Sequence, residues 1–206
     1  MLLDILILIS VLVAMMFMRS LTGIFPSLAA CLIRTKECFN LEASAKLSRS
    51  RNRIALVMIL PFCLTVVEYD LFDPEIMKDF SENLTVITIL AVFIIWYMLR
   101  LTMSRLFRSQ KIGNKIYSAA EGASYTFFII LTLVLLSVAG VTSVLNMDEA
   151  PVRNAMLWIS AVTYGLFLIR KTEIFMSSCS IFTAFLYLCA LEIIPTGILV
   201  VSAIIF

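Results

Sequence analysis

The ionisable residues of this sequence exclude much chemistry, because its 206 residues include no histidine. Ser–His and Cys–His nucleophile pairs therefore cannot form. Zinc sites of the HExxH type and histidine-ligated haem or di-iron centres are excluded for the same reason. An aspartyl dyad needs two intramembrane Asp residues that share a proton, whereas Asp4 and Asp70 lie at the outer ends of two different apolar windows. We predict no catalytic residue, no cofactor and no metal site, and hence no enzymatic activity.

The cysteines offer no recognisable site either. None of the five belongs to a CxxC pair, and we expect no disulfide framework. Buried small apolar side chains are the simplest interpretation. The five are Cys31, Cys38, Cys63, Cys179 and Cys189.

Glu192 is the ionisable residue of greatest interest, because it interrupts a long apolar run near the C-terminus. If the last span begins near Ile174, Glu192 lies about 27 Å further along the helix, close to the outer interface. Arg153 begins the preceding span at that same level, and a short turn makes the two spans antiparallel neighbours. We therefore predict an Arg153–Glu192 ion pair. Binding of a proton or cation by Glu192 is the functional alternative.

The elements that position these residues are membrane helices. The chain is 62% hydrophobic and 15% charged, whereas soluble domains are about half apolar and about a quarter charged. The net charge of +2 gives no reason to expect nucleic acid. Runs that are apolar on every side predict helices rather than barrel strands. We expect one all-α membrane domain over 1–206, with six spans near 2–18, 54–72, 84–103, 123–145, 152–169 and 174–194.

Charge sorts the connections between these spans into two groups. The connections at 19–53, at 100–121 and near 170 hold fourteen of the sixteen basic residues, whereas the other connections are acidic. Because basic loops stay in the cytoplasm, we predict a multi-pass protein of the bacterial inner membrane with both termini on the periplasmic side.

Two stretches do not fit a simple span. Residues 20–33 are too short to cross, and 174–206 are too long for one crossing of a hydrocarbon layer of about 30 Å. Pro195 and Gly197 are the expected helix break. We predict short interfacial or re-entrant helices near 20–33 and 196–206.

A basic helical face is predicted between the first two spans. Lys46, Arg49 and Arg53 are spaced i, i+3 and i+7, which places them on one face. Such a face suits the anionic headgroups of the cytoplasmic leaflet. A lipid-linked phosphate substrate is the alternative.

Two longer segments carry a family resemblance. They are FNLEASAKLSRSRNRIALVMILPFCL at 39–64 and FLYLCALEIIPTGIL at 185–199. Together they resemble an uncharacterised bacterial family of small multi-pass inner-membrane proteins, catalogued as a domain of unknown function. The resemblance implies an inner-membrane location and brings no activity, cofactor or site.

Three functions remain open from the sequence. The first is a non-enzymatic accessory or assembly subunit of an envelope complex, with a membrane-protein partner that the sequence does not identify. The second is a small transporter or channel, which would need polar or ionisable groups from several helices inside the membrane. The third is a lipid-modifying enzyme, for which no motif is present.

Overall fold

The computed structural model describes residues 2–72, 74, 81–106, 113–145, 147–177 and 179–205, and these residues confirm the predicted all-α class. Six of the helical segments are long and apolar enough to cross a membrane. The bounds are α1 Leu2–Ile33, α2 Thr35–Ala43, α3 Ala45–Glu68, α4 Glu82–Leu106, α5 Asn114–Leu145, α6 Glu149–Met176, α7 Ile181–Leu188 and α8 Ile194–Ile205. A π-helical turn, Cys189–Ile193, joins α7 to α8.

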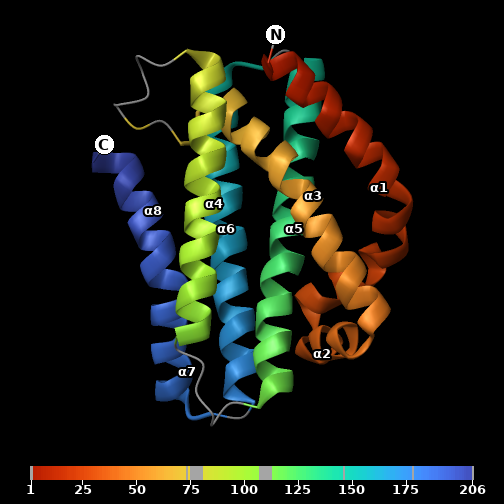
Figure 1. Ribbon diagram of the computed structural model, residues 1–206, viewed down its shortest axis with the longest axis vertical. Coiled ribbons are helices and arrows are strands. Elements are labelled where there is room, and N and C mark those ends of the chain that lie inside the picture. The colour runs from red at the N-terminus through yellow and green to blue at the C-terminus, as the bar shows by residue number, and fades with distance from the viewer. Residues whose placement is uncertain are drawn as a thin grey trace.

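The six spans alternate in direction, so that both termini lie at one end of the bundle (Figure 1). The short helix α2 lies at the opposite end, together with the ends of α4 and α6 and the beginnings of α5 and α7. We call this opposite end the basic end, because the helix ends next to the three basic connections of the sequence lie there. The loop charges within 75–80 and 107–112 are outside the described residues.

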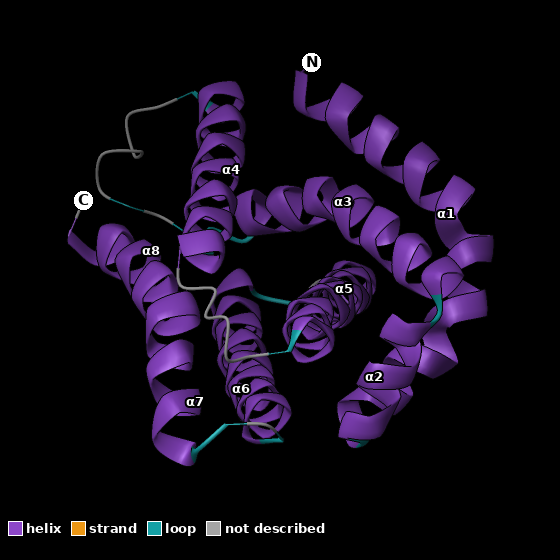
Figure 2. Ribbon diagram, turned by 60° about the horizontal axis from the view of Figure 1, so that its bottom comes forward, coloured by secondary structure: helices purple, strands orange, loops and turns teal. Residues whose placement is uncertain are grey.

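Helix α5 forms the centre of the packing. It contacts α3, α6, α2 and α1, and Figure 2 shows it between α3 and α6. Small side chains crowd its first half, where Ala119, Ala120 and Ala123 are all buried against Phe175 of α6. Small residues allow helices to approach closely, which is the main source of packing energy between helices in lipid.

The segment 20–33 is not a separate helix, which corrects the prediction. Helix α1 continues through Pro26 and ends at Ile33, and Figure 1 shows that it curves along its length. A proline inside a helix bends it without having to end it. The helix stops at Arg34, whose backbone is extended. Arg170 of α6 donates hydrogen bonds to the carbonyls of Leu32 and Ile33, which the end of α1 leaves without helical partners.

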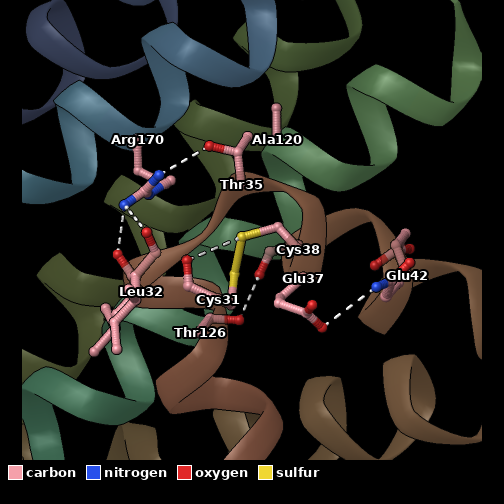
Figure 3. The surroundings of a disulfide bond; sticks show 12 residues. Cys31, Leu32, Thr35, Glu37, Cys38, Glu42, Ala120, Thr126 and Arg170 are labelled. Atoms are coloured by element: carbon pink, nitrogen blue, oxygen red, sulfur yellow. Dashed lines mark hydrogen bonds between the residues drawn. A yellow bond between two sulfur atoms is a disulfide. The ribbon is translucent and has the colours of Figure 1, made fainter.

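A disulfide joins Cys31 to Cys38, contrary to the expectation that the cysteines serve only as buried apolar side chains (Figure 3). The two residues lie on different helices, α1 and α2, with their Cα atoms 4.8 Å apart. The extended backbone at Arg34 turns α2 back beside the end of α1. Seven-residue spacing alone does not reveal such a turn, which is why the sequence did not predict the pair.

The last span lies later in the sequence than predicted. Helix α6 extends to Met176, and the final span begins at Ile181 rather than near 174. Helical structure also continues past Pro195 and Gly197, so these residues do not end the helix and 196–206 is not an independent interfacial helix. A proline ring clashes with the carbonyl four residues earlier and donates no hydrogen bond. The wider π turn just before Pro195 accommodates both effects within a continuous helix.

Candidate functional site

Glu192 lies at the centre of a buried ionic cluster. The Nε atom of Arg100 lies 3.1 Å from each carboxylate oxygen of Glu192, and its Nη2 lies 2.7 Å from Oε1. Lys171 Nζ forms a second ion pair with Oε1. The side chain of Glu192 is only 3% exposed, against 4% for Lys171 and 14% for Arg100. We call these three residues the charged triad; one carboxylate is held between two cations.

Three separate spans supply the triad. Arg100 comes from α4, six residues before the helix ends at Leu106, and Lys171 comes from α6, five residues before Met176. Glu192 lies eleven residues into the last span, on the π-helical turn. At 1.5 Å per residue these positions lie about 8–17 Å inside the helical ends. The triad therefore lies within the apolar part of the bundle, in the half nearer the basic end.

Neighbouring side chains fix the triad. Lys171 Nζ lies 5.5 Å from the ring centre of Phe167, and Arg100 Cζ lies 5.9 Å from that of Trp96. Each aromatic residue is one helical turn before its cation, within the range of a cation–π interaction. Arg100 also donates a hydrogen bond to Ser124 of α5. In this way α5 contacts the triad, and its Glu121 lines the cavity beside the triad.

The main chain at Glu192 is held as well as its side chain. The hydroxyl of Tyr164 on α6 donates a hydrogen bond to the Glu192 carbonyl oxygen, at 3.1 Å. π-helical turns occur mostly as single turns within α-helices, and frequently at functional sites. Here the π turn positions the one buried carboxylate among the described residues.

A small cavity adjoins the triad. Its volume is about 20 Å³, and Arg100, Lys171 and Glu192 line it together with Glu121 and three tyrosines. This is room for about one water molecule. The tyrosines are Tyr97, Tyr117 and Tyr125, and the hydroxyls of Tyr97 and Tyr125 lie 2.9 Å apart. The cavity is thus water-sized, bordered by both polar and apolar side chains, and located between α4, α5, α6 and the last span.

Arg153 does not pair with Glu192, and the predicted pair is wrong. Arg153 and Lys171 lie on the same helix, eighteen residues apart, which is about 27 Å along its axis. Since Glu192 pairs with Lys171, it lies near the opposite end of α6 from Arg153. Arg153 instead lines an open hollow with Glu68, Asp70 and Glu149. The error arose because the last span was taken to begin at Ile174, which placed Glu192 too close to the outer interface.

The predicted basic face does lie on the surface. Lys46, Arg49 and Arg53 are all exposed in the first turns of α3, and their binding of anionic headgroups stays a prediction. Arg51, between them, points inward and is 2% exposed. It forms an ion pair of 2.8 Å with Glu42 of α2.

This second ionic cluster joins α2 and α3 to α5. Glu42 also accepts hydrogen bonds from Ser48 at 3.2 Å and from Ser118 at 2.6 Å. The guanidinium of Arg51 lies 5.8 Å from the ring centre of Tyr125, and Tyr125 also lines the cavity beside the triad. Tyr125 therefore adjoins both the cavity of the triad and Arg51 of the second cluster.

Fold and site together define a multi-pass α-helical membrane protein with an ionic cluster buried between its spans. The chain belongs to the family described as Domain of unknown function (DUF4271), whose model matches residues 3–202. Neither a curated protein nor a solved structure matches the chain. Membership agrees with the resemblance seen in the sequence to a family of unknown function, and it assigns no residue a role.

Proposed function

We propose that this protein is a small carrier that moves protons together with a small solute across the membrane, with Glu192 as the proton-binding group. The observation that carries the proposal is the charged triad beside a water-sized cavity. Ionisable groups inside a membrane protein are costly, and they mark ion and proton pathways in pumps and transporters. The sequence alone supported transport poorly because Arg100 and Lys171 were assigned to loops.

Four neutral polar residues of the spans do not extend this site. Thr126 and Thr132 bond to carbonyls of their own helix four residues earlier, at 3.2 and 2.9 Å. Ser137 and Ser160 do the same at 2.7 and 2.9 Å. Such bonds satisfy a hydroxyl locally. The proposed chemistry therefore rests on the triad and its immediate neighbours, and it is carriage rather than catalysis.

A flux measurement tests the proposal. The full chain is reconstituted into vesicles that contain a pH-sensitive dye, and gradients of nitrate, chloride, phosphate, sodium and potassium are imposed in turn. We expect at least one gradient to drive proton movement faster than in protein-free vesicles. Glu192→Gln should abolish the added rate, because an amide cannot take up the proton.

Two controls accompany this measurement. Glu149→Gln makes the same chemical change at an exposed residue of the other end and should leave the rate unchanged. The double variant Lys171→Gln with Glu192→Gln keeps the triad's net charge but lacks the carboxylate, and it should also be inactive. Equal rates in wild type and Glu192→Gln, or no rate above that of empty vesicles, would contradict the proposal.

An accessory or assembly subunit of an envelope complex is the second candidate. The observation that favours it is the Glu42–Arg51 cluster, whose carboxylate is satisfied by Ser48, Ser118 and Arg51 within the chain. Such a closed cluster suits a structural scaffold. Purification in mild detergent followed by mass spectrometry separates the candidates, because an accessory subunit should retain a stoichiometric protein partner.

The orientation proposed is that of the positive-inside rule, with the basic end in the cytoplasm of a bacterial inner membrane. Disulfides are uncommon in reducing compartments such as the cytoplasm. The Cys31–Cys38 disulfide at the basic end therefore favours the opposite orientation, and a direct measurement decides between the two. Reporter tags fused at Gln110 and Lys78 should be accessible from the cytoplasm and the periplasm respectively. Reversed accessibility would invert the proposed orientation.

A further inference from the structure

The donors around Glu192 form a cradle for a planar oxyanion. The fork of Arg100 contacts both carboxylate oxygens, and the Lys171 ammonium contacts one of them. An Arg fork matches a carboxylate or phosphate group. Nothing in this cradle is particular to a side chain, since the same donors would hold any oxyanion of that shape.

The charge balance of the triad couples the binding of an oxyanion in the cradle to the protonation of Glu192. With Glu192 ionised, the triad carries two positive charges and one negative charge. A proton on Glu192 neutralises the carboxylate and leaves both cations without their partner, and a buried charge without a partner is strongly destabilising. The titratable groups around Glu192 and its cavity are Arg100 and Tyr97 of α4, Tyr117, Glu121 and Tyr125 of α5, and Lys171 and Tyr164 of α6.

The cavity is too small to hold both the Glu192 carboxylate and an external oxyanion beside Arg100 and Lys171. The cavity of about 20 Å³ holds a single water-sized group, so an external oxyanion fits only where the Glu192 carboxylate has left the cations. The π turn offers a way to leave, because it holds one residue more than an α turn and can revert by a local shift.

From these features we infer that protonation of Glu192 transfers the Arg100–Lys171 pair to a small oxyanion, so that the site takes up one proton and one oxyanion together. The proton comes from water and binds a carboxylate oxygen of Glu192; no covalent bond other than O–H forms. The inference rests on the proposed function and deepens it by naming the co-transported solute as a carboxylate-like or phosphate-like anion.

A binding experiment tests this inference apart from flux. The full chain is placed in phosphatidylcholine nanodiscs, and its melting temperature is followed against nitrate with chloride as the matched salt. Nitrate is planar and stays charged over the range from about pH 8 to about pH 4.5 used here. In the wild type, stabilisation by nitrate should grow as the pH falls. Glu192→Gln should bind nitrate at about pH 8 at least about tenfold more tightly than the wild type does.

Further variants isolate the cradle. Glu149→Gln should behave as the wild type, and the triple variant Arg100→Gln, Lys171→Gln, Glu192→Gln should show no nitrate effect. If Glu192→Gln does not fold, the double variant Lys171→Gln with Glu192→Gln replaces it. Nitrate should stabilise this double variant to the same extent at every pH. An effect that survives in the triple variant, or a wild-type effect that does not change with pH, overturns the inference.

The source of the oxyanion is resolved by a second lipid. Stabilisation by nitrate or inorganic phosphate in phosphatidylcholine supports a soluble anion, whereas pH-dependent stabilisation obtained only with phosphatidylglycerol supports a lipid headgroup. Binding without proton flux would refute carriage and keep the oxyanion site. Proton flux without any oxyanion effect would refute the oxyanion and keep carriage.

Discussion

Glu192→Gln is expected to lower the free energy of unfolding by about 3–5 kcal/mol, the usual cost of removing one partner from a buried ion pair. The variant keeps the shape of the side chain but leaves Arg100 and Lys171 facing each other without a carboxylate. Two like charges in a water-poor site repel more strongly than at a surface. The measurement is unfolding by SDS titration in mixed micelles, with helical content as the signal.

The control for this prediction is Glu149→Gln, which removes the same charge from an exposed side chain at the other end of the bundle. Exposed charges contribute little to stability, so a change within about 0.5 kcal/mol is expected. If the two variants lost equal stability, the triad would not be the buried pair described here.

Gly122→Val is expected to destabilise the protein by about 1–3 kcal/mol through the second ionic cluster. A Cβ atom at Gly122 would lie 2.5 Å from Arg51 Nη1 and 2.8 Å from Glu42 Oε2. Glu42 Oε2 accepts a hydrogen bond from Arg51 Nη2, and the Arg51 side chain is only 3% exposed, so neither side chain can easily move away. The larger side chain must therefore displace a satisfied ion pair. Unfolding in SDS again provides the measurement.

Gly165→Val is the matched control, because Gly165 lies within α6 and a Cβ atom there would have no neighbouring heavy atom within 4 Å. The two variants carry the same helix-propensity change. The difference between their losses of unfolding free energy therefore measures the steric clash at Gly122 alone. Gly122→Ser, with a smaller side chain, should fall between wild type and Gly122→Val. A Gly165→Val loss as large as that of Gly122→Val would remove the explanation by steric conflict.

The architecture was predictable because hydropathy and loop charge are long-range averages. Six apolar windows and the alternation of their connections survive an error of several residues at each boundary. The boundary between the last two spans was wrong, because the basic residues near 170 were taken as the end of a span. Lys171 is followed by Ile174 and Phe175, so apolar residues continue beyond the charge.

Whether the site could be predicted depended on the boundaries of the spans more than on the types of its residues. Glu192 was identified from its chemistry alone, but its partners depend on the depth at which each helix places its charge. The last span begins at 181 rather than at 174, and for this reason the partners of Glu192 are Arg100 and Lys171 instead of the predicted Arg153. Arg51 was missed for a related reason: it falls between the exposed positions Arg49 and Arg53, and only its contact with Glu42 shows that it points inward.

The most direct test of the charged triad is a pair of double-variant cycles that share Glu192→Gln. Combined with Lys171→Gln, the loss of unfolding free energy should be smaller than the sum of the single losses by more than about 1 kcal/mol, as for residues in contact. Combined with Arg153→Gln, the losses should add within about 0.5 kcal/mol. Additive losses with Lys171 together with coupling to Arg153 would contradict the triad.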